Sequence, residues 1–152
     1  MAILVNILWV LAAFWSMEFV AWFAHKYVMH TFGWQLHKDH HEPTGHSFQR
    51  NDLFALIFAI PSWLCMQAGI MLEEYWLMYI GIGILLYGMA YFYLHEVIIH
   101  DRWKFRGKVK HWYLRALAKA HFAHHKHKEK EHGECFGMLV VPFKYFKEAQ
   151  SK

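Results

Sequence analysis

Residues 53–94 decide the fold and read LFALIFAIPSWLCMQAGIMLEEYWLMYIGIGILLYGMAYFYL. Two apolar stretches, 53–72 and 75–94, flank the pair Glu73-Glu74. At about 1.5 Å per residue, each stretch is about 30 Å long as a helix, which matches the hydrocarbon core of a bilayer. Because hydrocarbon offers no hydrogen-bond partners, only a helix satisfies the backbone of such a segment. The sequence therefore predicts a hairpin of two spanning helices with almost no loop.

A third apolar stretch, residues 1–24, precedes this hairpin. Residues 1–24 and 53–94 together hold no Lys, Arg or His, although the chain of 152 residues has 16 Lys+Arg and 14 His. Soluble helices spread their charges along one face, so this segregation predicts an integral membrane protein. No basic segment precedes the first stretch, and the stretch is longer than a signal-peptide core, so we expect a retained span.

We expect one all-α, integral membrane domain over residues 1–152, with a cytoplasmic, histidine-rich helical cap. It has three transmembrane helices, or four if residues 136–146 also cross. That segment, FGMLVVPFKYF, is short and contains Pro142, so it is expected to lie in the interface or to cap the domain. The composition of residues 111–126 predicts a helix along the membrane surface.

Charge predicts the orientation of the chain. Because the hairpin is tight, the polar blocks 25–52 and 95–152 must emerge on the same side. Residues 95–152 carry 13 basic and six acidic side chains, which indicates that this side of the membrane is cytoplasmic. The membrane accounts for this excess, so nucleic acid is not an expected partner. Four basic residues are also candidates for docking an acidic partner protein: Lys104, Arg106, Lys108 and Lys110.

Ten histidines form a pattern that recurs. Residues 25–52 and 95–135 each contribute one HxxxxH followed by one HxxHH. The ten are His25, His30, His37, His40, His41, His95, His100, His121, His124 and His125. In an HxxHH helix, the offsets of three and four fall within about 60° of the first histidine, so all three rings can point at one place. An offset of five is about 140° away, so each HxxxxH pair converges only if its helix ends, unwinds or carries a π-bulge.

Ten imidazoles suit two metal ions, since a zinc ion takes about four ligands. All-nitrogen ligation favours Fe, Zn, Cu or Ni over Mg or Ca. Asp39, Glu96 and Asp101 lie beside these histidines and are candidates to hold their second ring nitrogens. We expect no catalytic residue beyond the metal ligands. The other four histidines are expected to be solvated: His46, His111, His127 and His132.

This order of histidine boxes resembles the membrane-bound fatty acid hydroxylase superfamily and, within it, the bacterial β-carotene hydroxylases. The resemblance covers residues 18–146 and rests on HKYVMH, GWQLHKDHHEP, YGMAYFYLHEVIIHDRW and AHFAHHKH with ECFGMLVVP. It implies a monooxygenase in which the ten histidines hold two Fe²⁺ ions and O₂ is the co-substrate. The implied reaction hydroxylates carbon 3 of β-ionone rings, from β-carotene through β-cryptoxanthin to zeaxanthin, and from canthaxanthin to astaxanthin. Glu96 stands where many relatives carry Asp.

The resemblance also implies a bacterial inner membrane as the location and a carotenoid that enters from the bilayer. Because the sequence has no nicotinamide, flavin or iron–sulfur motif, the electron donor is expected to be a separate, ferredoxin-like protein. One alternative is a hydroxylase or desaturase of the same superfamily that acts on fatty acyl chains or sterols. Another is a non-enzymatic membrane metal transporter or bis-histidine haem protein. Both of these need polar ligands inside the spans, whereas the predicted spans contain no histidine.

Overall fold

The computed structural model describes residues 1–42, 46, 48–104, 109–127 and 133–151. In chain order its elements are α1 (Ala2–Ala24), η1 (His25–Met29), α2 (Trp34–His41), η2 (Arg50–Asp52), α3 (Leu53–Met71), α4 (Tyr75–Phe92), η3 (Tyr93–Ile99), α5 (Trp112–Lys126) and α6 (Phe143–Gln150). The elements η1 and η3 are π-helical, and η2 is a single 3-10 turn. Every regular element in the described part of the chain is a helix, which confirms the predicted all-α fold.

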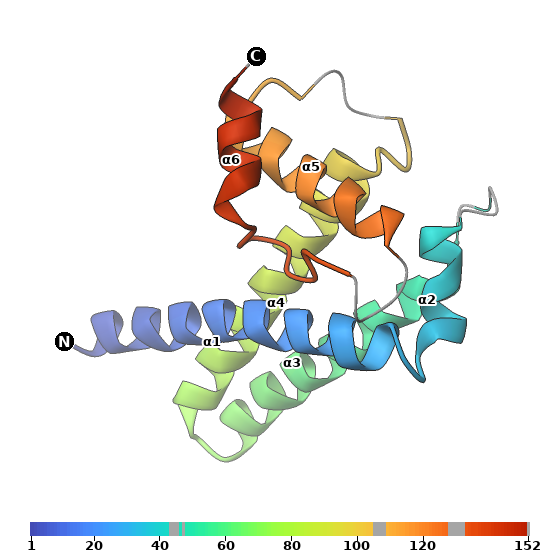
Figure 1. The fold of residues 1–152 in the computed structure, drawn as a ribbon. Coiled ribbons are helices and arrows are strands. Elements are labelled where there is room, and N and C mark those ends of the chain that lie inside the picture. Colours follow the sequence, from blue (N-terminus) through green and yellow to red (C-terminus); the bar gives the residue numbers. More distant parts are fainter. Residues whose placement is uncertain (43–45, 47, 105–108, 128–132, 152) are drawn as a thin grey trace.

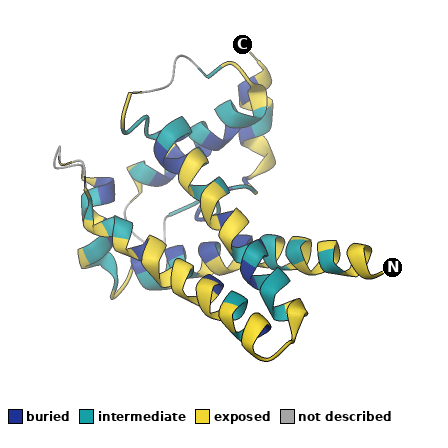
Figure 2. Cartoon of the chain, turned by 180° about the vertical axis from the view of Figure 1, so that it is seen from behind, coloured by how far each residue is buried: buried dark blue, intermediate teal, exposed yellow. Residues whose placement is uncertain are grey.

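Three segments are long and apolar enough to cross a membrane, namely Ala2–Met29, Arg50–Met71 and Tyr75–Ile99. They confirm the three predicted spans, and within the described residues no fourth segment qualifies. Many large apolar side chains along these helices are exposed, as Figure 2 shows for the hairpin and for the N-terminal part of α1. Such extended apolar surface is what a helix presents to lipid.

The spans pack closely through small residues on α4. The helices α3 and α4 lie side by side as a hairpin, and α1 crosses α4 (Figure 1). A Cβ at Gly83 would lie 2.5 Å from the carbonyl oxygen of Val10 on α1. A Cβ at Gly81 would lie 2.7 Å from the carbonyl oxygen of Ser62 on α3, whose hydroxyl donates to the Gly81 carbonyl at 2.7 Å. Glycine thus lets both neighbouring helices approach the α4 backbone.

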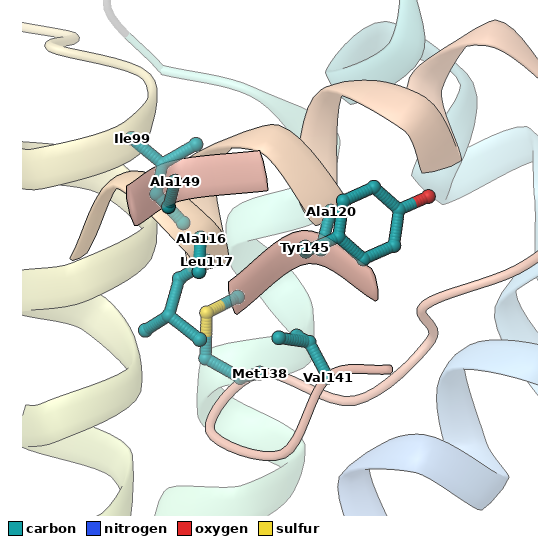
Figure 3. Close-up of a cluster of buried hydrophobic side chains, with 8 residues drawn as sticks. All are labelled: Ile99, Ala116, Leu117, Ala120, Met138, Val141, Tyr145 and Ala149. Atoms are coloured by element: carbon teal, nitrogen blue, oxygen red, sulfur yellow. The ribbon is translucent and has the colours of Figure 1, made fainter. Parts of the chain in front are cut away.

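A cap formed by α5, α6 and the segment between them packs over the ends of the spans. Ala116 and Ala120 on α5 are fully buried, and Met138 and Val141 of the irregular segment pack in the same cluster (Figure 3). The predicted helix over 111–126 is confirmed as α5. Residues 136–146 pack against α5 and form no fourth span.

Candidate metal centre

Both HxxxxH pairs are brought onto one face by π-turns. The backbone N–H of His30 donates to the carbonyl of His25 at 3.1 Å, and the N–H of His100 donates to the carbonyl of His95 at 2.9 Å. These bonds join residues five apart, which is the spacing that defines a π-helix. The π-bulge is one of the three distortions that the sequence allowed, and it occurs at both pairs. Each lies where a span ends, so the distortion aims both rings at the cap.

The first cluster contains five buried or nearly buried histidines whose ligand atoms lie within 4.8 Å of one another: His25, His30, His37, His41 and His124. The Nε2 atoms of His25 and His37 are 3.0 Å apart. The Nε2 atoms of His30 and His124 are 3.1 Å apart. The first cluster therefore joins η1, α2 and α5.

The second cluster contains four histidines that meet the same 4.8 Å limit: His40, His95, His100 and His121. His125 extends it, because its Nε2 lies 2.8 Å from that of His121 and 3.0 Å from that of His40. The His125 ring also stacks on His41 of the first cluster, with ring centroids 4.4 Å apart. All ten predicted histidines are thus gathered in two touching clusters.

Each HxxHH box serves both clusters. His37 and His41 of α2 lie in the first cluster, whereas His40 crosses to the second. On α5 the roles are exchanged, since His121 lies in the second cluster and His124 crosses to the first. The helix explains the division: an offset of four lies about 40° to one side of the first residue, and an offset of three about 60° to the other. The i and i+4 rings therefore share one cluster and the i+3 ring reaches the next.

Hydrogen bonds to Nδ1 fix the tautomers of three rings in the first cluster. His25 Nδ1 donates to the carbonyl of Phe136 at 3.0 Å, and His124 Nδ1 donates to the carbonyl of Glu134 at 3.1 Å. His37 Nδ1 donates to Asn51 Oδ1 at 2.7 Å. A carbonyl oxygen can only accept, so Nδ1 carries the hydrogen and the lone pair is on Nε2.

The geometry and charge of the clusters fit metal ions. Burial lowers the pKa of His37 and of His124 to about 3, so both rings are neutral at physiological pH. His25 and His37 both carry the hydrogen on Nδ1, so their Nε2 lone pairs face each other at 3.0 Å, which is repulsive unless a cation lies between them. Two nitrogens at roughly 2.1 Å from one ion are about 3 Å apart when their bonds are perpendicular. The buried His95 Nε2 has no hydrogen-bond partner within the described residues, as expected of a metal-facing atom.

Glu96 holds a ring of the second cluster, as its position beside His95 suggested. Its Oε1 accepts from His95 Nδ1 at 2.7 Å, and its Oε2 accepts from Arg102 at 3.1 Å. Arg102 also donates to both oxygens of Asp52, at 2.7 and 2.8 Å. A chain of hydrogen bonds thus connects Asp52 through Arg102 and Glu96 to His95. The neighbouring residue Asn51 accepts directly from His37. The short element η2 therefore supports one ring in each cluster.

The other two acidic candidates are placed differently. The carboxylate of Asp39 accepts from the backbone N–H groups of Arg50 and Asn51, so it acts on His37 through Asn51. Asp101 lies in the turn after η3, at a φ of 48°, and its carbonyl accepts from Lys104 N–H at 2.8 Å. Asn51 and the two carbonyls were not predicted. Asn51 is a polar residue at the start of a span, which was a usable signal, whereas a carbonyl carries none.

The remaining predicted residues lie on the surface where they are described. Lys104 and Lys110 are exposed, and Arg106 and Lys108 lie outside the described residues. His46, His111 and His127 are exposed, in agreement with their predicted solvation, and His132 lies outside the described residues.

Comparison with known proteins identifies the family of this chain. The family model described as "Fatty acid hydroxylase" matches residues 10–143. The chain therefore belongs to the fatty acid hydroxylase family. No solved structure matches it significantly.

Within this family, the chain is similar to several proteins named β-carotene hydroxylases. It is 42% identical to the "Beta-carotene hydroxylase" of Pantoea ananas over 84% of this chain and 72% of the relative. It is 36% identical to that of Paracoccus sp. (strain PC1) over 88% of this chain and 82% of the relative. It is also 36% identical to the "Beta-carotene 3-hydroxylase, chloroplastic" of Haematococcus lacustris over 84% of this chain and 40% of the relative. These relatives support an oxidoreductase of the hydroxylase type, and the histidine clusters fit a metal site.

Proposed function

We propose that this chain is a di-iron, O₂-dependent monooxygenase that hydroxylates carbon 3 of carotenoid β-ionone rings. It converts β-carotene through β-cryptoxanthin to zeaxanthin, and canthaxanthin to astaxanthin where that pigment is present. The observation that carries the proposal is the pair of touching histidine clusters at the ends of three spans. Support for the substrate comes from the bacterial relatives, and support for the position comes from the Haematococcus lacustris relative.

The ten histidines of the two clusters hold the ions as neutral ligands. When bound, two ferrous ions supply the activation of O₂ and two of the four electrons that it takes up. The other two electrons come from the substrate C–H bond; one oxygen atom enters that bond and the other leaves as water, with two protons taken up. The protein's own part is orientation: Asn51, Glu96 and two backbone carbonyls fix Nδ1–H, so that each Nε2 faces its cluster.

The membrane supplies the substrate. The clusters lie where the spans end, at η1 and η3, so a carotenoid ring can reach them while its polyene chain stays in hydrocarbon. The positive charge of residues 95–152 favours the cytoplasmic side of a bacterial inner membrane for this end. A soluble electron donor in the cytoplasm can then bind at the end of the protein that holds the two clusters.

The direct test is pigment analysis in a β-carotene-producing bacterium. Expression of this chain is expected to yield β-cryptoxanthin and zeaxanthin, separated by chromatography. His127→Ala, at an exposed histidine outside both clusters, should yield the same pigments. Well-expressed protein that produces no hydroxylated pigment would reject the carotenoid assignment, and hydroxylated fatty acyl or sterol products would favour the alternative substrate class.

We further propose that a ferredoxin-like protein docks on the basic run that contains Lys104 and Lys110. Reversing the charges of Lys104, Arg106 and Lys108 to Glu is expected to lower ferredoxin-driven turnover roughly tenfold, since like charges slow association. Turnover with a small chemical reductant should change little. Lys147→Glu, on the exposed face of α6, is the control. An equal loss with both reductants would contradict docking at this site.

A further inference from the structure

The orientation of the first cluster depends on a segment without regular structure. Residues 133–142 contain no helix, yet the carbonyls of Glu134 and Phe136 hold the Nδ1 atoms of His124 and His25. A helix fixes its carbonyls through its own hydrogen bonds, but an irregular segment needs an external support. In the fold, this segment lies between α1 and α5 (Figure 1).

That support is a carboxylate within the first span. Glu18 lies on α1 and is 8% exposed. Its Oε1 accepts from three consecutive backbone N–H groups, those of Met138, Leu139 and Val140, each at 2.9 Å. Its Oε2 accepts from the Tyr87 hydroxyl at 2.7 Å. Successive N–H groups of this kind form an anion-binding concavity, and Glu18 fills it.

The sequence of the segment is adapted to this contact. A Cβ at Gly137 would lie 2.8 Å from Glu18 Oε1, so a larger residue would push the carboxylate away from its donors. Glu73 and Glu74, the other two acids within residues 1–24 and 53–94, are exposed at the hairpin turn. A buried acid inside a span is costly, and such residues commonly mark functional positions.

We propose that Glu18 is a positioning residue for the metal of the first cluster. Glu18 fixes the backbone of residues 138–140, and this fixes the position of the preceding carbonyls. The Phe136 carbonyl then orients His25, and the Glu134 carbonyl orients His124. The second cluster has a separate support, since Glu96 holds His95. Loss of Glu18 therefore weakens one metal site and spares the other. This inference rests on the proposed metal binding.

The test is an anaerobic titration of purified, metal-free protein with Fe²⁺, which measures two binding phases. Glu18→Ala is expected to weaken one phase by about 10- to 100-fold, the usual effect of losing an outer support, and to leave the other unchanged. Glu18→Gln should fall between, because its amide oxygen can still accept from the three N–H groups. Gly137→Ala should have the same effect as Glu18→Ala, because the added Cβ would displace the Glu18 carboxylate from its three N–H donors. Glu74→Ala, which removes an exposed acid, is the matched control.

The outcomes separate this inference from the proposed function. Two unchanged phases in both Glu18→Ala and Gly137→Ala would overturn the role of Glu18 while leaving the metal centre intact. Equal weakening of both phases would also overturn it, because Glu18 would then support the whole fold. Wild-type protein without two iron-binding phases would overturn the proposed function, and the inference with it.

Discussion

Replacing His40 by alanine is expected to remove the metal of the second cluster, although His40 belongs to the first histidine block. Carotenoid hydroxylation should fall by roughly a thousandfold or more, since the metal's contribution of several kcal/mol is lost. His124→Ala should have an equally large effect on activity but should empty the first cluster. The reason is the crossing of the i+3 histidine of each HxxHH box. Metal analysis of the purified variants, together with pigment analysis of the expressing cells, measures both effects.

The controls for this prediction are histidines outside the clusters. His111→Ala and His127→Ala should keep both metals and most of the activity, because both side chains are exposed. Comparable turnover in all four variants would contradict the assignment of the ligands. If His40→Ala and His41→Ala emptied the same site, the crossing of the boxes would be wrong, even though the histidines were ligands.

Metal removal is expected to destabilise the protein strongly. The first cluster brings together imidazole nitrogens from η1, α2 and α5, and the facing lone pairs of His25 and His37 repel each other once a chelator removes the ion. A ligand present at a thousand times its Kd stabilises the folded state by about 4 kcal/mol per site. For a chain of this size, loss of two such sites corresponds to a fall in Tm of roughly 15 °C or more. Thermal unfolding in detergent, followed by circular dichroism, measures the change.

The matched control for chelation is the double variant His40→Ala/His124→Ala. It lacks one ligand in each cluster, so a chelator should leave its Tm nearly unchanged. A wild-type Tm that stays constant after verified loss of metal would show that the clusters do not tie the cap to the spans.

Local periodicity explains which features the sequence predicted. The three spans follow from length and apolarity, and the convergence of each HxxHH box follows from helical geometry. The five-residue spacing of each HxxxxH pair also predicted that the helix ends, unwinds or carries a π-bulge there. The structure has π-helical turns at both pairs, η1 and η3.

Long-range contacts explain what it did not predict. The His25–Phe136 hydrogen bond joins residues 111 positions apart, and its acceptor is a backbone carbonyl that any residue provides. Glu18 was visible as an acid in an apolar stretch, but its partners are the Tyr87 hydroxyl and three backbone N–H groups more than 100 residues away. The division of the histidines between two clusters likewise requires the relative placement of α2 and α5, which no local pattern specifies.

The crossed boxes have a consequence for biosynthesis. The first cluster is completed by His124, which the ribosome adds 83 residues after His41. At roughly 5–20 residues per second, a nascent chain carries four of those five histidines for on the order of ten seconds before the last one is made. Neither site is therefore complete on half a chain, and under the proposed metal binding both can hold an ion in their final geometry only after translation of α5.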